Sequence, residues 1–209
     1  LGMLGGREAR AAEAPKRSTP SAEALGWKVS CAQYTFRRFT LYETLDMLAE
    51  LGIGFVEPAF FLRLDKARPA LTVNESLSPA ERKEVKTRLA DRGVRMASFY
   101  SNMGSDEAAA RKIFDFSAEM GVEVIVAEPA PAALGMIDKL CGEYKINLGI
   151  HNHPKKAQYA FWAPANVMAA CQGHSSRIGG CCDTGHWVRS GLDPVECLKK
   201  MEGRITSMH

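Results

Sequence analysis

The feature that most constrains the fold of this 209-residue chain is a regular alternation of short apolar segments with longer amphipathic segments. Glycines mark the junctions: Gly52, Gly93, Gly121 and Gly203 each lie between a predicted helix and the predicted strand that follows. Strand and helix repeating in this order are typical of parallel βα units. We therefore predict an α/β protein built on a parallel sheet.

Seven such units can be counted along the chain. An eight-stranded (β/α)8 barrel averages about 250 residues, so we expect a barrel that is incomplete at the C-terminus, lacking the seventh helix and the eighth unit. A doubly wound sheet could also hold seven strands, but no glycine-rich phosphate loop follows the first strand. The predicted strands cover residues 27–34, 54–58, 94–100, 122–129, 146–154, 178–182 and 204–209, and the predicted helices cover 40–51, 78–92, 106–120, 132–144, 164–173 and 193–201.

Composition is that of an ordinary globular chain. With 46% hydrophobic and 24% charged residues, it can form one sizeable core. A net charge of +3, with no basic run interleaved with aromatics, argues against nucleic acid as a partner. No apolar run approaches the roughly 20 residues of a membrane helix. The six cysteines contain no CxxC pair and are interpreted as small buried hydrophobes.

The first 25 residues are set apart from the fold. Residues 1–6 are apolar and glycine-rich, and residues 10–14 are small like those before a signal-peptide cleavage site. We interpret 1–25 as a disordered leader or signal-peptide remnant, with a disordered Ala-rich tail as the alternative. The barrel then covers 26–209. If residues 1–25 are the remnant of a signal peptide, we expect the protein to be exported to the periplasm. If they are not, we expect it to be cytoplasmic.

Ligand-type residues collect at the ends of the predicted strands. In a parallel barrel these ends open onto one face, so the side chains converge. Carboxylate plus imidazole is the usual ligand set for Mn²⁺, Zn²⁺ or a similar divalent ion, which can polarise a hydroxy-carbonyl substrate. Each residue alone could simply hydrogen-bond a loop, so the prediction rests on their joint occurrence. The residues are Glu57, Glu128, His151, His153, Asp183, His186 and His209.

The strongest functional signal lies in residues 177–194. Residues 178–182 are small and apolar, as expected for a strand covered on both faces. Asp183 and His186 follow where that strand stops, and we expect a loop there. Asp193, Pro194 and Glu196 then carry the signals of a new helix start.

This segment resembles a known family. Cys181-Cys-Asp183-Thr-Gly-His186-Trp-Val-Arg-Ser-Gly191-Leu-Asp193 is similar to the Cys-x-Asp-Thr-x-His-x4-Gly-x-Asp pattern of the xylose-isomerase-like TIM-barrel superfamily. That superfamily includes sugar phosphate isomerases and epimerases and the type 2 AP endonucleases. The resemblance covers about residues 27–209. It implies that Asp183 and His209 bind a metal ion and that His186 contacts the substrate.

Two departures from the family pattern matter. His151 stands where the sugar epimerases have an acid on strand five, so Glu128 from the neighbouring strand is expected to supply the missing carboxylate. The glutamate that epimerases carry on strand eight has no counterpart in these residues. A two-base epimerisation cannot be completed without it, so we expect either part of a longer enzyme or an inactive form.

The resemblance implies a metal-dependent sugar or sugar phosphate isomerase or epimerase. Its ion would hold an enediolate formed by proton abstraction next to a carbonyl. The expected ligands are Glu128, His151, Asp183 and His209; Glu128 and His186 are the expected catalytic residues, and the expected substrate contacts are His153, His186, Trp187 and Glu57.

Three other functions stay open. Within the same chemistry, the chain could be a lyase or dehydratase acting on an oxidised sugar or glycoside. From other classes, it could be a metal-free binding barrel or an AP endonuclease, although too few histidines and basic residues are present for the last. We expect a small carbohydrate ligand and allow for a homo-oligomer.

Aromatic side chains near the predicted mouth could stack on a sugar ring or simply pack. Arg37 and Arg38, after the first strand, could bind a phosphate or carboxylate, although solvated side chains are the simpler interpretation. The aromatic residues are Tyr34, Phe36, Phe60, Phe61, Trp162 and Trp187.

Overall fold

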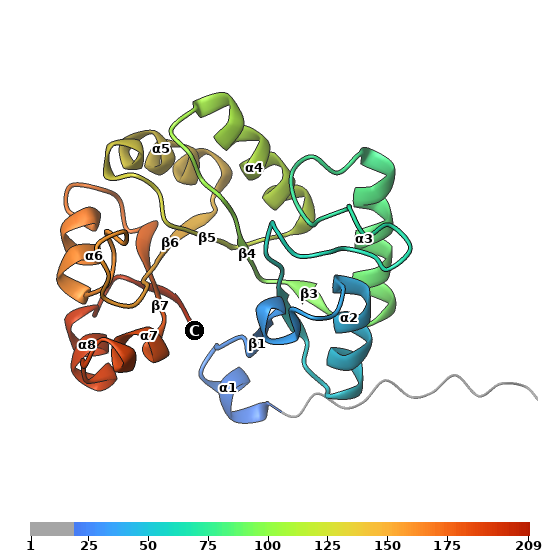
Figure 1. Cartoon of the computed structure of the whole chain (residues 1–209), viewed down its shortest axis with the longest axis horizontal. Helices are drawn as coiled ribbons and strands as arrows, with labels where there is room; N and C mark the ends of the chain where they lie inside the picture. Colours follow the sequence, from blue (N-terminus) through green and yellow to red (C-terminus); the bar gives the residue numbers. More distant parts are fainter. Residues whose placement is uncertain (1–18) are drawn as a thin grey trace, which may run out of the picture.

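Short parallel strands and the helices between them curl into an open barrel in the computed structural model, which describes residues 19–209 (Figure 1). The strands are β1 (Ser30–Ala32), β2 (Phe55–Glu57), β3 (Arg95–Met96), β4 (Ser98–Tyr100), β5 (Val124–Ala127), β6 (Asn147–His151), β7 (Ile178–Cys182) and β8 (Ile205–Met208). The α-helices are α1 (Pro20–Ala24), α2 (Leu41–Glu50), α3 (Pro79–Asp91), α4 (Glu107–Met120), α5 (Leu134–Tyr144), α6 (Pro164–Cys171), α7 (Thr184–Arg189) and α8 (Pro194–Lys200), and the short 3-10 helices are η1 (Gln33–Phe36) and η2 (Pro131–Ala133).

The strands pair in chain order, β1-β2-β3 in one sheet and β4 to β8 in another, and every pair is parallel. Strands β3 and β4 are two pieces of the single predicted strand 94–100, interrupted at Ala97. The sheets are joined because the Tyr100 amide donates to the Pro58 carbonyl (2.9 Å) and the Phe60 amide to the Tyr100 carbonyl (2.9 Å). Seven strand positions therefore form one curled sheet, and the predicted incomplete (β/α)8 barrel is confirmed.

The two edges of the curled sheet, β1 and β8, are not paired with each other in the described residues. A cavity of about 460 Å³ lies between them, lined by both edges and reaching Glu57 and His209. Figure 1 shows the chain end after β8 lying inside the curl of strands and helices.

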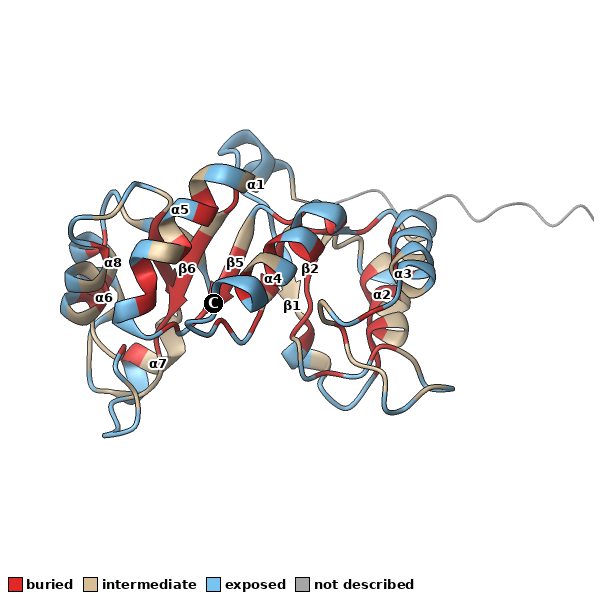
Figure 2. Ribbon diagram, turned by 90° about the horizontal axis from the view of Figure 1, so that it is seen from above, coloured by how far each residue is buried: buried red, intermediate tan, exposed pale blue. Residues whose placement is uncertain are grey.

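Most of the helices lie outside the curl and bury their inner faces against the sheet (Figures 1 and 2). Phe99, Phe114, Phe116 and Trp187 are fully buried in this core. Strand β7 is buried along its whole length, as its small apolar sequence predicts. A Cβ atom on Gly179 would lie 2.4 Å from the Arg204 carbonyl oxygen, so the close approach of β7 to the chain entering β8 requires glycine. All six cysteines are free thiols, and five are buried.

The predicted helix starts are confirmed by their caps. Thr40 and Ser78 form capping boxes that open α2 and α3, and the Asp193 side chain accepts hydrogen bonds from the Val195 and Glu196 amides at the start of α8. Gly121 ends α4 in the left-handed region, with φ of 75°. Local sequence thus sets where the elements begin and end.

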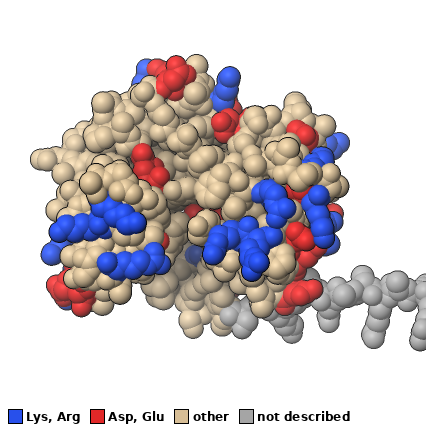
Figure 3. Space-filling model, viewed as in Figure 1, with Lys and Arg blue, Asp and Glu red and all other residues tan. Residues whose placement is uncertain are grey.

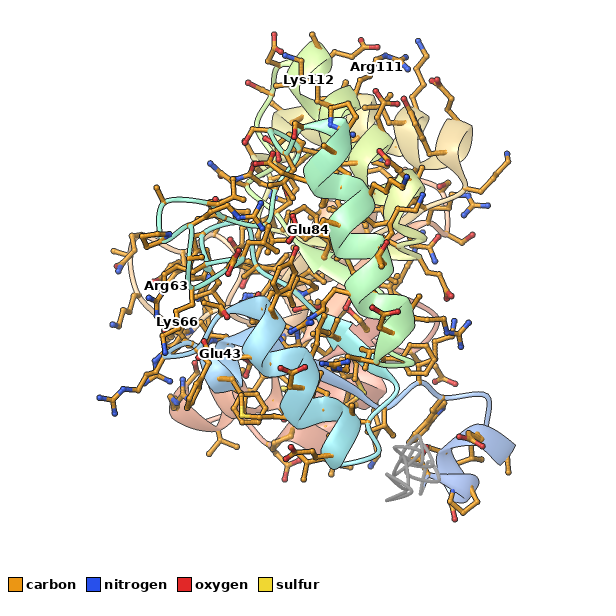
Figure 4. All side chains as sticks on the ribbon, turned by 90° about the vertical axis from the view of Figure 1, so that its right-hand side faces the viewer. Glu43, Arg63, Lys66, Glu84, Arg111 and Lys112 are labelled. Atoms are coloured by element: carbon orange, nitrogen blue, oxygen red, sulfur yellow. The ribbon has the colours of Figure 1, made fainter. Side chains whose placement is uncertain are left out.

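The outer surface carries exposed ion pairs that join neighbouring elements (Figure 4). Arg111 on α4 pairs with Glu143 on α5 (2.7 Å), and Glu84 on α3 pairs with Arg68 in the preceding loop (2.7 Å). Such pairs contribute little to stability, roughly 0–1 kcal/mol each. No helix among residues 19–209 has both the length and the apolar character needed to cross a bilayer.

One predicted segment lies mostly outside the described residues, and another differs from prediction. The range interpreted as a leader, 1–25, lies mostly outside the described residues, but its last part forms the exposed helix α1. The loop predicted after Asp183 is instead the short helix α7. It forms because the Asp183 carboxylate accepts a hydrogen bond from the His186 amide (2.7 Å) and so caps the helix.

Candidate metal centre at the carboxyl ends of the strands

The carboxyl ends of six strands bring titratable side chains to one place. Two overlapping groups have potential ligand atoms within 4.8 Å of one another, and His151 belongs to both. One group contains Asp183 and His209 in addition to His151, and the other contains Glu128 and His153. The curl of the sheet therefore achieves the convergence that the sequence predicts.

Asp183 is held rigidly beside His151. Its backbone is clasped by Asn152, which donates to the Asp183 carbonyl (2.9 Å) and accepts from the Asp183 amide (2.8 Å). Asp183 Oδ2 lies 3.5 Å from His151 Nε2 and 3.5 Å from His186 Nε2. Burial raises the pKa of Asp183, but interactions with His151 and His186 outweigh burial and lower it to about 2. The carboxylate is thus ionised at neutral pH.

Glu128 accepts hydrogen bonds from three side chains through one oxygen. Its Oε1 lies 2.7 Å from the Tyr100 hydroxyl, 2.9 Å from His151 Nδ1 and 3.0 Å from His153 Nε2. Burial opposes ionisation, but these hydrogen bonds outweigh it and lower the pKa of Glu128 to about 2. The pKa of His151 is raised: burial favours its neutral form, but the nearby Asp183 and Glu128 carboxylates outweigh burial.

His209 is held by a buried acid. Glu57 is 5% exposed and its Oε1 lies 2.8 Å from His209 Nε2, while its other oxygen accepts from the Ser98 hydroxyl. Burial lowers the pKa of His209, but interactions with Cys181 and Glu57 outweigh burial and raise it. Glu57 and Glu128 therefore each hold one histidine of the Asp183 group.

His186 projects from the first turn of α7 toward Asp183. The Arg189 guanidinium lies 2.8 Å from His186 Nδ1, and because a guanidinium can only donate, Nδ1 accepts and the ring proton is on Nε2. Burial lowers the pKa of His186, with nearby positive charges adding to this effect. The ring is thus a neutral hydrogen-bond donor that faces the Asp183 carboxylate.

Aromatic side chains continue from this centre toward the surface. The Tyr100 ring lies 5.6 Å from the His151 ring and contacts Phe60 and Phe61, and Phe61 contacts Tyr34. Tyr34 and Phe61 are 55% and 45% exposed. On the other side, Tyr159 stacks on His153 with ring centroids 4.1 Å apart. The centre is therefore bordered by exposed rings.

Basic side chains lie farther out. In the view of Figure 3, Lys and Arg gather in two groups, one over α6 and α8 and one near β1 and α2. Arg37 and Arg38 are exposed, and Arg37 lies over the Tyr34 ring at 5.2 Å. Trp162 is partly buried and lies under Lys155 at 4.7 Å.

The predicted role of Trp187 is corrected. Its side chain is completely buried in the core, so it offers no surface to a substrate. The reason is helix α7: in a helix, adjacent residues point in different directions, and His186 faces the centre while Trp187 faces the interior. Glu57, also predicted to contact a substrate, instead lies buried behind His209.

Four residues of the centre were missed from the sequence. Tyr100 and Ser98 lie on the predicted strand 94–100 and Asn152 on the predicted strand 146–154, so their positions were a usable signal. Hydroxyl and amide side chains are not among the carboxylates and imidazoles on which the predicted metal site rests. Arg189 had no signal, since its place three residues after His186 matters only once α7 is known to be a helix.

The residues fit a divalent cation. Asp183, His151 and His209 supply one carboxylate and two imidazoles, which together suit Zn²⁺ and similar ions better than Mg²⁺. Two ligands bound at about 2.1 Å from one ion lie about 3.0–3.4 Å apart. The 3.5 Å separation of Asp183 Oδ2 from His151 Nε2 is close to this spacing.

Comparison with known proteins gives matches at the level of structure. No protein-family model and no curated protein sequence matches the chain. An uncharacterized protein from Parabacteroides distasonis is 33% identical, with a TM-score of 0.74 over 88% of this chain and 74% of that one.

Two more distant structures share the fold. A xylose isomerase-like TIM barrel protein from Mycobacterium smegmatis, solved with magnesium, is 17% identical, with a TM-score of 0.67 over 89% of this chain and 75% of that one. The 3-keto-D-glucoside 4-epimerase of E. coli is 12% identical, with a TM-score of 0.68 over 87% and 78%.

Proposed function

We propose that this chain, which shares the fold of a xylose isomerase-like TIM barrel protein, belongs to that superfamily and is a metal-dependent isomerase or epimerase acting on a sugar or sugar derivative. The observation that carries the proposal is the convergence of His151, Asp183 and His209 on one point at the carboxyl ends of the strands. The 3-keto-D-glucoside 4-epimerase supports the reaction class, as a protein of the same fold that acts on a sugar.

The proposed reaction begins with the transfer of a proton from the carbon next to a carbonyl group to His153 Nδ1, which carries the lone pair of the neutral ring because Nε2–H donates to Glu128. A bound divalent ion would supply Lewis-acid polarisation of that carbonyl. Loss of the proton leaves negative charge on the carbonyl oxygen, and we assign the neutral His186 to stabilise that charge through a hydrogen bond from its Nε2–H. The Arg189 guanidinium donates to the other ring nitrogen of His186, Nδ1, and so keeps the Nε2–H group in its orientation.

The exposed aromatic rings beside the centre suit the other end of such a substrate. The apolar C–H faces of a sugar ring pack on aromatic faces. Phe61 contacts Tyr100, Tyr34 contacts Phe61, and Tyr159 stacks on His153. We propose Tyr34, Phe61 and Tyr159 as the carbohydrate contacts, in place of Trp187.

Exchange with solvent tests the proposal without knowledge of the product. The protein is freed of metal, loaded with Zn²⁺ or Mn²⁺ and incubated in D₂O with ketoses, aldoses and keto-glycosides. Deuterium should appear at the carbon next to the carbonyl, and Asp183→Ala should abolish the incorporation. Metal-loaded protein that exchanges no carbon-bound hydrogen in any of these sugars would contradict the proposal.

A further inference from the structure

Glu128 differs from Asp183 in what its oxygens touch. The three groups on Glu128 Oε1 lie 2.7–3.0 Å away, which is hydrogen-bond distance. Asp183 Oδ2 lies 3.5 Å from two imidazole nitrogens, beyond a good hydrogen bond. The Oε1 oxygen of Glu128 is therefore saturated by donors, whereas Asp183 Oδ2 faces nitrogens at about the separation of two ligands on one ion.

His151 connects these two carboxylates through its two ring nitrogens. Because an ionised carboxylate can only accept, the 2.9 Å contact with Glu128 places the ring proton on Nδ1. In the neutral ring, which is the form that binds a metal ion, the lone pair is then on Nε2, the nitrogen that faces Asp183. The His151 side chain is 7% exposed, so solvent offers Nδ1 little alternative to Glu128.

The Glu128 carboxylate is itself held in place by further hydrogen bonds. The Tyr100 hydroxyl and His153 Nε2 both donate to the oxygen that holds His151, and the His153 ring is stacked on Tyr159. Residues from β4, from β6 and from the segment after β6 thus form one network around a single oxygen of Glu128, which follows β5. Such a network gives the ring it holds one orientation.

We propose that Glu128 is a positioning residue, which fixes the Nδ1–H tautomer of His151 so that Nε2 can bind the ion, and that Glu128 is not itself a ligand. This inference rests on the proposed function only in assuming the ion at His151, Asp183 and His209. The group formed by Glu128, His151 and His153 is then a hydrogen-bonded network rather than a second metal site. Metal-binding histidines commonly carry such a carboxylate partner, whose loss lowers metal affinity about 10–100-fold.

Cobalt binding separates a positioning residue from a ligand. Metal-free protein is titrated with Co²⁺ and its visible absorption recorded for wild type, Glu128→Gln, Glu128→Ala, Tyr100→Phe and Asp183→Ala. We expect Glu128→Ala to bind about 10–100-fold more weakly with the wild-type spectrum, because the ligands are unchanged. Glu128→Gln, which keeps an acceptor, and Tyr100→Phe should lose less, and Asp183→Ala should lose the spectrum.

The proposal is overturned if Glu128→Ala changes the cobalt spectrum or abolishes binding as Asp183→Ala does, because Glu128 would then be a ligand. It is equally overturned if Glu128→Ala leaves the affinity unchanged. Circular dichroism of each variant shows whether it remains folded.

A second measurement needs no metal. Nitrogen-15 NMR of metal-free protein, at a pH where His151 is neutral, should show the Nδ1–H tautomer in wild type and its loss in Glu128→Ala. An unchanged tautomer in Glu128→Ala would overturn the proposal. A wild-type protein that bound no Co²⁺ would refute the proposed function, and the tautomer would still decide the role of Glu128.

Discussion

At the scale of single residues, the centre consists of two histidines that are each held by one acid. Glu57 holds His209 and Glu128 holds His151, and an Asp183 oxygen lies within 4.8 Å of a ring nitrogen of each. Neither acid was expected in this role, since the sequence predicts Glu57 as a substrate contact and Glu128 as a ligand and base. A pKa of about 2 makes Glu128 a weak base, which also favours the positioning role.

Glu57 offers a residue-scale prediction. Glu57→Gln keeps an oxygen that can accept from His209 but removes the negative charge that favours it. We expect metal affinity to fall about tenfold, at the low end of the range for lost partners of metal-binding histidines, measured by competition with a chromophoric chelator. Glu143→Gln, an exposed acid on α5, is the control and should leave the affinity unchanged. Equal affinities for wild type and Glu57→Gln would count against this role.

The acids also predict how stability depends on pH in the metal-free protein. Asp183 and Glu128 have folded pKa values of about 2, below unfolded values of about 3.9 and 4.3. Their ionised forms therefore stabilise the fold above about pH 5, and this contribution is lost as pH falls toward 2. Urea unfolding between pH 6 and pH 3 should show a steeper loss of stability for wild type than for Glu128→Gln. Parallel curves would show that Glu128 has no such shift.

At the scale of elements, most of the fold could be predicted because its signals are local. Capping residues such as Thr40, Ser78 and Asp193 satisfy backbone groups within their own helix, so sequence alone locates them. Helix α7 escaped prediction because its cap, Asp183, also looks like a ligand at the end of a strand. Which nitrogen of His151 faces which acid depends on contacts between β5, β6 and β7, and no local pattern encodes that.

At this scale, the prediction concerns the close packing of strand β7 at Gly179. Gly179→Ala would place a methyl group 2.4 Å from the Arg204 backbone and force β7 away from β8, which carries His209. We expect a loss of about 1–3 kcal/mol in the free energy of unfolding together with weaker metal binding. Gly135→Ala is the matched control, because that glycine lies in α5 with open space around it and should stabilise by about 0.5–1 kcal/mol. Urea denaturation compares the two, and equal effects would contradict the packing argument.

At the scale of the whole molecule, the proposed ion would link the ends of three strands that are otherwise held side by side by the hydrogen bonds of strand pairing. The ligands lie at the ends of β6, β7 and β8, and β8 is an edge of the sheet. Zn²⁺ at a thousand times its Kd should therefore raise the free energy of unfolding by about 4 kcal/mol. Asp183→Ala should show no such gain. Chemical denaturation with and without Zn²⁺ measures both, and an equal gain in the variant would place the ion elsewhere.

The most direct test of the central claim is the position of the ion itself. Crystals of Zn²⁺-loaded protein, measured on both sides of the zinc absorption edge, give an anomalous difference map that locates it. The account predicts one peak within about 2.0–2.2 Å of His151 Nε2, a carboxylate oxygen of Asp183 and a ring nitrogen of His209, with Glu128 still bonded to His151 Nδ1. A peak coordinated by Glu128 and His153, or no peak at the ends of these strands, would contradict it.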